Sequence, residues 1–189
     1  MQYILCLIVF LAGVGKSFGQ SEVYNAVNQI LELTENAAQT ENPSFSYNVV
    51  LERSDGINFP ISNIDELFKD EAIAKYFTED DKQAFKNQIK EYKIFNYQTD
   101  SIRGKTILTA TDLRDLKSDH KRFWDKYKRK FGNTGFYDIS FPLFSKDRTK
   151  LLISIGRNSF KGVSDGGVYI YNKTNEGWRP YKALFIWMG

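Results

Sequence analysis

The hydrophobic period of the chain changes at Phe136, and this change constrains the fold more than any other feature of the sequence. From Phe136 to Phe144 apolar and polar residues alternate, which is typical of a half-buried β-strand. Three further apolar runs follow at residues 151–155, 168–171 and 178–188. Strands that follow one another and are joined by short polar turns predict an antiparallel meander in the C-terminal half of the chain.

Before Phe136 the hydrophobic period is that of helices. Apolar residues three and four positions apart predict helices over residues 22–38, 64–77, 78–92 and 112–131. Ser62 or Asn63 can cap the second of these helices, and Thr78 with Asp81 forms a capping-box pattern at the start of the third. Short strands are predicted over residues 45–53, 57–61 and 105–110. The fold class is therefore α+β, with N-terminal helices followed by a C-terminal antiparallel β-meander of about four strands.

The length of 189 residues suits one domain, and no linker rich in Pro, Ser or Gly divides the chain. An aromatic content of 15% and an apolar content of 42% exclude a disordered chain. We therefore expect one globular α+β domain, which covers residues 20–189 once the N-terminal segment described next is removed.

The N-terminus has the pattern of a signal peptide. Residues 4–14 form an uncharged apolar run, which is shorter than the roughly 20 residues that a membrane span needs. Ser17 and Gly19 supply small residues at a cleavage site before Gln20. Cys6 does not lie at that site, so a lipoprotein anchor is not expected. We predict cleavage of residues 1–19 and a secreted or periplasmic protein without a transmembrane anchor; the alternative is a buried N-terminal strand or helix.

The C-terminal half resembles a group of exported, uncharacterised proteins of Bacteroidetes, over about 70 residues from Phe123 to Gly189. The resemblance lies in the order of short motifs, which are Phe123-Trp124-x-x-Tyr127, Phe131-Gly-Asn-Thr-Gly135, Ile139-Ser-Phe-x-x-Phe144, Gly166-Gly-Val-Tyr169, Gly177-Trp178 and Ile186-Trp187. Members of the group often carry a Cys-Gly-Gly-type loop between the second and third strands. That loop contains no cysteine here. The resemblance implies export and the fold, and no established activity comes with it.

Several kinds of catalytic and metal chemistry are excluded by composition. With one Cys and one His, neither a disulfide scaffold nor a zinc site of several His and Cys ligands can form. No phosphate-binding Gly-x-x-x-x-Gly-Lys motif and no calcium-loop motif occur, so no cofactor is expected. His120 is the one candidate for a general base, in a small hydrolase that would pair it with a carboxylate. The helical period of residues 112–131 places His120 on the buried stripe, which favours a histidine at the edge of the core.

The same predicted helix is strongly basic on its opposite face. Between Arg114 and Lys130 eight Lys or Arg residues stand against three Asp. Three of these cations, Lys121, Arg122 and Lys128, are candidates for binding an anionic component of the cell envelope. Glycan, lipopolysaccharide or an acidic protein would each suit them. Nucleic acid is not expected as a partner of an exported protein, and the alternative is a solvated helix face.

A second candidate binding segment is the glycine-rich stretch from Gly156 to Gly167, which we expect to be a long loop on the sheet. Long loops on a sheet scaffold often carry function. The candidate binding residues here are Arg157, Phe160, Lys161 and Asp165. Trp124, Trp178 and Trp187 lie in strongly patterned elements and are expected in the core. Taken together, the sequence favours a binding or interaction module at the cell envelope over an enzyme; a small hydrolase and a structural envelope component stay open as alternatives.

Overall fold

The computed structural model describes residues 2–41, 46–54, 63–159 and 164–189, and within helix α1 it describes the side chains from Gly19 to Ala38. The α-helices are α1 (Gln2–Glu41), α2 (Ile64–Leu67), α3 (Glu71–Tyr76), α4 (Glu79–Glu91), α5 (Ala110–Lys117) and α6 (Phe123–Phe131), and η1 (His120–Arg122) is a 3-10 helix. The strands are β1 (Val49–Leu51), β2 (Arg53–Ser54), β3 (Phe95–Asn96), β4 (Thr106–Leu108), β5 (Phe136–Ile139), β6 (Leu143–Phe144), β7 (Lys150–Asn158), β8 (Ser164–Thr174) and β9 (Gly177–Met188).

The main sheet is mixed, with seven strands in the order β4-β1-β5-β7-β8-β9 and β6 paired to β7. β5, β7, β8 and β9 are antiparallel neighbours, which agrees with the predicted α+β class and meander. β1 pairs in parallel with both β4 and β5, so the prediction of a purely antiparallel sheet is wrong. The reason is connectivity: helices α2 to α4 lie between β1 and β4, and such long helical crossovers join parallel strands.

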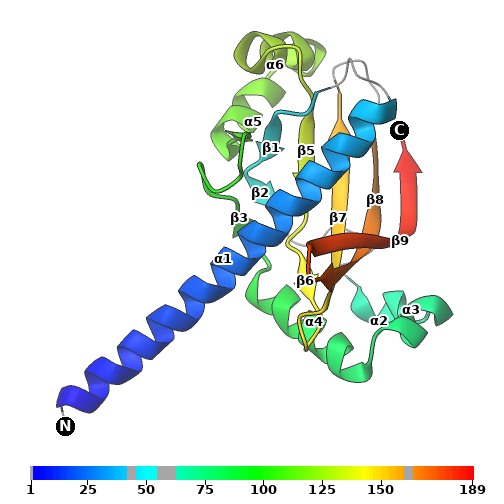
Figure 1. The fold of residues 1–189 in the computed structure, drawn as a ribbon. Helices are drawn as coiled ribbons and strands as arrows, with labels where there is room; N and C mark the ends of the chain where they lie inside the picture. Colours follow the sequence, from blue (N-terminus) through cyan, green and yellow to red (C-terminus); the bar gives the residue numbers. More distant parts are fainter. Residues whose placement is uncertain (1, 42–45, 55–62, 160–163) are drawn as a thin grey trace.

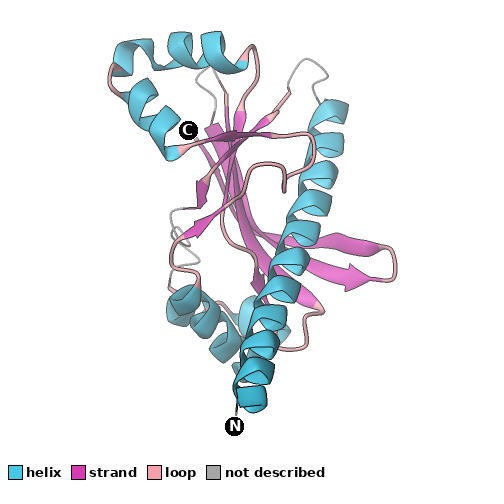
Figure 2. Cartoon of the chain, turned by 90° about the vertical axis from the view of Figure 1, so that its left-hand side faces the viewer, coloured by secondary structure: helices cyan, strands magenta, loops and turns pink. Residues whose placement is uncertain are grey.

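Helix α1 covers one face of the sheet (Figure 1 and Figure 2). Its buried residues recur with helical spacing at Val23, Ala26, Val27, Ile30 and Leu31, which confirms the predicted amphipathic helix. The amide of Trp178 in β9 donates to the side-chain oxygen of Gln29 at 3.1 Å and adds a polar tie to this contact. The helix is therefore held to the sheet chiefly by apolar burial.

The opposite face carries a second, smaller core at the end of the sheet formed by β4, β1 and β5. Strand alternation assigns the faces, because Val50 and Tyr137 belong to the core under α1, whereas Val49 and Phe136 belong to the second core. Helices α5 and α6 close this second core, and Figure 2 shows them on the other side of the sheet from α1. A platform of two helices is thus fixed to one end of the sheet.

The predicted helix starts are confirmed where a capping side chain defines them. The Asn63 side chain accepts a hydrogen bond from the Glu66 amide at 3.1 Å. Thr78 and Asp81 form the predicted capping box: the Asp81 amide nitrogen lies 3.1 Å from the Thr78 hydroxyl oxygen, and the Thr78 amide nitrogen lies 2.9 Å from the Asp81 carboxylate. The helix predicted over residues 64–77 is divided into α2 and α3, because the Asp70 carboxylate caps a new helix at the Ala72 amide. The strand predicted over residues 57–61 lies outside the described residues.

The helix predicted over residues 112–131 is broken into α5, η1 and α6. Asp119 has an extended backbone (φ −138°, ψ 93°), which turns the chain between the two helices. Ser118 and Asp119 both favour non-helical conformations through local hydrogen bonding. Because of the break, His120 leaves the apolar stripe and is exposed, so its predicted burial is wrong.

The long loop predicted from Gly156 to Gly167 is largely strand. β7 and β8 continue their ladder through the pairs Gly156–Gly166, Arg157–Asp165 and Asn158–Ser164. Gly166 lies in the strand for a packing reason, because a Cβ atom there would come within 2.6 Å of the Trp187 ring. Glycines that suggested a loop are thus sites of close approach within a sheet.

Asp147 gives the turn between β6 and β7 a pH-dependent stability. Its carboxylate accepts hydrogen bonds from the Ser145 hydroxyl at 2.6 Å and from the Thr149 amide at 3.0 Å and hydroxyl at 2.8 Å, which lower its pKa from 3.8 to about 2. Since the pKa is depressed in the folded state, the stabilisation is present above pH 3.8 and is lost as the pH falls through about 2.

We expect an NMR titration of the Asp147 carboxyl carbon to give a midpoint near pH 2. Asp147→Asn should remove this contribution and reduce the pH dependence of unfolding below pH 3.8. A midpoint at the ordinary value for aspartate would show that the three hydrogen bonds do not form in solution.

Candidate functional site

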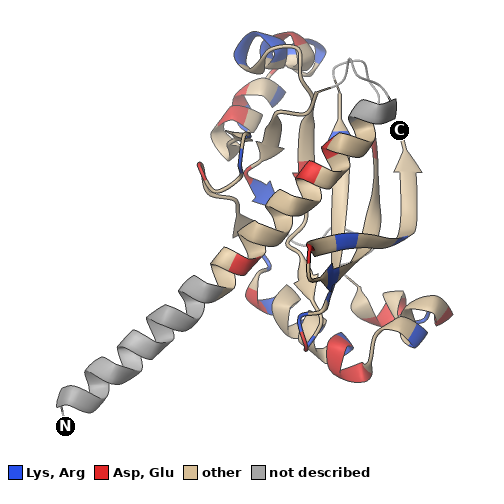
Figure 3. Cartoon of the chain, viewed as in Figure 1, with Lys and Arg blue, Asp and Glu red and all other residues tan. Residues whose placement is uncertain are grey.

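The helix pair at the end of the sheet presents a dense set of cations, which we call the cation surface. Its members are Arg114 and Lys117 on α5, Lys121 and Arg122 on η1, and Lys126, Lys128, Arg129 and Lys130 on α6. All of them are exposed except Lys126, which is half-buried. Figure 3 shows the resulting concentration of Lys and Arg on these helices. The structure therefore brings together the predicted binding residues Lys121, Arg122 and Lys128.

Aromatic packing holds α6 in place beneath these cations. Tyr127 is fully buried. The centroid of its ring lies 5.6 Å from that of the Phe136 ring in β5 and 5.3 Å from that of the Trp124 ring. The Phe123 ring is stacked with the Tyr127 ring, and their centroids are 6.3 Å apart. One face of α6 is thus committed to the second core, and its remaining surface is free to carry charge.

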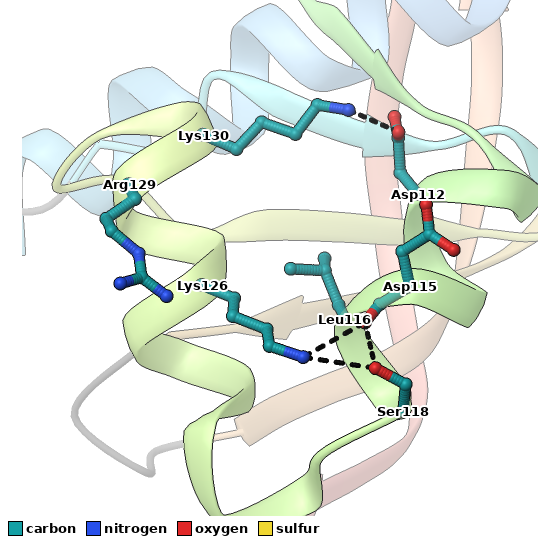
Figure 4. A pocket seen from close by; sticks show the side chains of 7 residues that line it. All are labelled: Asp112, Asp115, Leu116, Ser118, Lys126, Arg129 and Lys130. Carbon is teal, nitrogen blue, oxygen red and sulfur yellow. Dashed lines mark hydrogen bonds and ion pairs between the residues drawn. The ribbon is translucent and has the colours of Figure 1, made fainter.

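A cleft of about 580 Å³ separates α5 from α6. Asp112, Asp115, Leu116 and Ser118 line it from α5 and the segment that follows, and Lys126, Arg129 and Lys130 line it from α6 (Figure 4). Lys130 forms an ion pair with Asp112 across the cleft. Lys126 donates to the Ser118 hydroxyl at 3.0 Å. These two lysines bridge the helices, as the dashed lines of Figure 4 show.

The bridging interactions leave several cations without a partner. Within the described ranges, the side chains of Arg114, Lys117, Lys121, Arg122 and Arg129 make no hydrogen bond or ion pair. Asp125 and Arg129, which stand one helical turn apart on α6, form no ion pair there. A guanidinium such as that of Arg129, at the edge of a cleft, can bind a carboxylate, phosphate or sulfate through two parallel hydrogen bonds.

Asp112 is the acidic counterpart within the cleft. Its burial alone would raise the pKa of its carboxyl, but hydrogen bonds from Lys130 and Thr109 and the charge of Lys130 lower the pKa below its usual range. Asp112 also closes a capping box with Thr109 at the start of α5, where the amide of Asp112 donates to the Thr109 hydroxyl at 3.1 Å. One ion pair and one cap therefore fix the α5 side of the cleft.

His120 does not form a catalytic arrangement in the described part of the molecule. It is exposed on η1 and makes no hydrogen bond or ion pair with a carboxylate there. The hydrolase alternative, which needs such a pair, gains no support from this geometry. Among the described residues no group of three or more His, Cys, Asp or Glu side chains could hold a metal ion.

The second set of predicted binding residues is divided. Arg157 and Asp165 face one another across β7 and β8 and form a two-pronged ion pair, with both N–O distances at 2.7 Å. The pair is about three-quarters buried on the α1 side, beside Tyr47 and Tyr137. Since each charge satisfies the other, the pair acts first as a cross-strand link. Phe160 and Lys161 lie outside the described residues.

The exposure of Trp187 and the position of Arg129 at the cleft are two surface features that the sequence does not predict. Trp178 is buried and Trp124 packs against the second core, as expected, but Trp187 is 39% exposed on β9 and is not a core residue. Arg129 is not among the predicted binding residues, although its position one turn after Asp125 and within a basic run is visible in the sequence. Its place at the cleft depends on the break between α5 and α6, which the helical period did not reveal.

No helix in the described part of the chain combines the length and the hydropathy that a membrane span requires. No protein-family model matches the chain, and no significant match was found among curated proteins or among solved structures.

Proposed function

We propose that this chain is an exported binding module that engages an anionic component of the cell envelope through the cation surface. The observation that carries the proposal is the distribution of charge. From Asp112 to Lys130 eight Lys or Arg stand against four Asp, while the whole chain has a net charge of only +3. The rest of the molecule therefore has no positive excess, and attraction for anions is concentrated at this end of the sheet.

The architecture beneath the charges supports a binding role. Unpaired cations close together on one platform repel one another, and this repulsion destabilises the platform unless an anion offsets it. An anion with several phosphate, sulfate or carboxylate groups would relieve this repulsion. The cleft beside Arg129 offers a place for one such group. Acidic glycan, lipopolysaccharide and acidic protein all present these groups, and binding experiments can compare the three.

The cation surface should determine binding to anionic polymers. We expect the triple variant Lys121→Gln, Arg122→Gln, Lys128→Gln to bind dextran sulfate and lipopolysaccharide at least about tenfold more weakly at low salt, since each lost contact removes on the order of 0.5–1 kcal/mol. Raising the salt should weaken binding by the wild type, because exposed charges are screened within about 8 Å at physiological ionic strength. Isothermal titration calorimetry at several salt concentrations measures both effects.

A matched control variant distinguishes the effect of where the cations lie from the effect of the net charge of the chain. Lys75, Lys90 and Lys93 are exposed lysines on or next to α3 and α4, away from the cation surface. Their triple replacement by Gln changes the net charge equally and should leave binding nearly unchanged. Equal losses in the two triple variants, or no binding by the wild type at low salt, would leave a solvated helix pair as the better account.

Export is the second part of the proposal. The described core residues of α1 lie between Val23 and Ala38, so a chain that begins at Gln20 keeps all of them. We expect protein isolated from its own cells to start at Gln20 and to occur outside the cytoplasm. N-terminal sequencing of the protein from separated cell fractions tests this, and Met1 retained on a cytosolic protein would contradict it.

A further inference from the structure

β9 is the last strand of the sheet, and it carries most of the large exposed hydrophobic side chains among the described residues. On one side it pairs with β8, and no described strand pairs with its other side. The described residues include six large hydrophobic side chains that are exposed, and five of them belong to β9. They are Tyr181, Phe185, Ile186, Trp187 and Met188, and Ile186 and Met188 are 71% and 86% exposed.

The backbone of the final stretch of β9 offers a regular set of free hydrogen-bonding groups. Ser164 and Gly189 exchange two backbone hydrogen bonds, at 2.7 and 3.3 Å. Bonded and non-bonded pairs alternate in an antiparallel ladder, and the register is unbroken from this pair back to Val168–Phe185. The amides and carbonyls of Phe185 and Trp187 therefore point toward β8, whereas those of Ile186 and Met188 point to the open edge.

Only the first half of β9 has the features that protect sheet edges. Pro180, Lys182 and two register shifts occur between Gly177 and Leu184, and each of these discourages pairing with another strand. Residues 183–189 contain neither proline nor charge. Figure 1 shows this red C-terminal half of β9 running along the outer side of β8. An apolar, regular and unprotected edge of this kind is a surface for adding a strand.

The segment best matched to this edge is the same segment of a second copy. An antiparallel pairing centred on Trp187 places Ile186 of each copy opposite Met188 of the other copy. Both of these residues present their backbone groups outward, so the two pairs would exchange four hydrogen bonds. Trp187 would stand opposite its own copy as the non-hydrogen-bonded pair at the centre, while its ring lies over Gly166 of β8. No charged side chain opposes another, because residues 183–189 have none.

We infer that two copies of this chain associate by antiparallel pairing of the end of β9, with Trp187 at the two-fold axis. The contact covers the apolar residues on both faces of the strand and continues the sheet from one copy into the next. Its area is small for a stable dimer, which buries about 800 Å² on each partner, so we expect association at micromolar concentrations. The cation surface takes no part in it.

Sedimentation velocity of the full chain at low and high micromolar concentrations tests this inference. The wild type should move from monomer to dimer with little dependence on salt. Ile186→Pro removes an outward amide without breaking the β8–β9 ladder, and Ile186→Lys keeps that amide and adds a charge; each should weaken association at least tenfold. Ile94→Lys makes the same change at an exposed isoleucine outside β9 and should associate like the wild type.

Amide hydrogen exchange of the wild type gives a readout that does not depend on the folding of any variant. The amides of Ile186 and Met188 should become protected as the concentration rises, while those of Phe185 and Trp187 are protected throughout. A wild type that stays monomeric, or Ile186 and Met188 amides that exchange equally fast at all concentrations, would overturn the inference. A monomer whose edge is protected only by an added extended peptide would also overturn it, because the edge would then serve a different protein. Dimerisation that survives the Gln triple variant of the cation surface would separate this result from that of the proposed function.

Discussion

Replacing Tyr127 with alanine should lower the free energy of unfolding by about 3–5 kcal/mol, the usual cost of deleting a fully buried aromatic ring. The ring of Tyr127 is the centre of the second core, in contact with Phe123, Trp124 and Phe136. Chemical denaturation followed by circular dichroism measures the loss, and binding to anionic polymers should fall with it because α6 carries half of the cation surface.

Tyr127→Phe is the control, and its free energy of unfolding should stay the same or rise. The Tyr127 hydroxyl is buried without a hydrogen-bond partner in the described part of the chain. Burial also raises the pKa of this hydroxyl, so it stays protonated and uncharged. Removing an unsatisfied polar group is neutral or stabilises by up to about 1–3 kcal/mol. A loss of stability in Tyr127→Phe as large as that in Tyr127→Ala would mean that the hydroxyl has a partner.

Lys105→Met should lower the free energy of unfolding by about 3 kcal/mol, because it leaves the partners of a buried charge unsatisfied. The Lys105 side chain is only 5% exposed and forms an ion pair with Glu35 of α1. Its ammonium also donates to the Tyr47 carbonyl at 2.9 Å and lies 5.7 Å from the centre of the Tyr137 ring. One side chain thus joins α1, β5 and the segment before β1.

A double-mutant cycle with Glu35→Leu tests the origin of this effect. Replacing both members of a buried ion pair by apolar residues is often close to neutral. We therefore expect the double variant Lys105→Met, Glu35→Leu to recover much of the loss in thermal or chemical denaturation. A single Lys105→Met variant as stable as the wild type would show that the pair contributes nothing to the packing of α1.

Local signals in the sequence predicted local structure well. Asn63, Thr78 and Asp81 define helix starts through side chains that reach backbone amides three residues away, and such contacts depend on nothing distant. The alternation after Phe136 predicted the antiparallel order of β5, β7, β8 and β9 for a similar reason, since consecutive strands joined by short turns pair with each other.

The elements that sequence reasoning missed depend on contacts between distant segments. β1 lies between β4 and β5, which follow it by many residues, and no local pattern specifies those parallel pairs. The break at Asp119 was hidden because Leu113, Leu116, Phe123 and Tyr127 fit one helical stripe. In the structure they face one another across two helices that close on the same core.

The candidate site also combines features that the sequence predicts with features that depend on contacts between distant segments. The identity of the cations was evident from the basic run, but the cleft beside Arg129 and the exposure of His120 both follow from the break between α5 and α6. The glycine-rich pattern predicts Arg157 and Asp165 as parts of a loop, whereas the extended β7–β8 ladder makes them a cross-strand pair. Residue types revealed the chemistry, and tertiary contacts determined which of those residues are available for it.

Mapping of an anionic ligand onto the isotope-labelled chain by two-dimensional NMR tests the central claim most directly. Dextran sulfate at low salt should shift the amide signals of α5, η1 and α6 most strongly, with the Arg129 side chain among them. The shifts should reverse as salt is added. The largest changes on β7, β8 or β9, or no change at low salt, would contradict an anion-binding role for the cation surface.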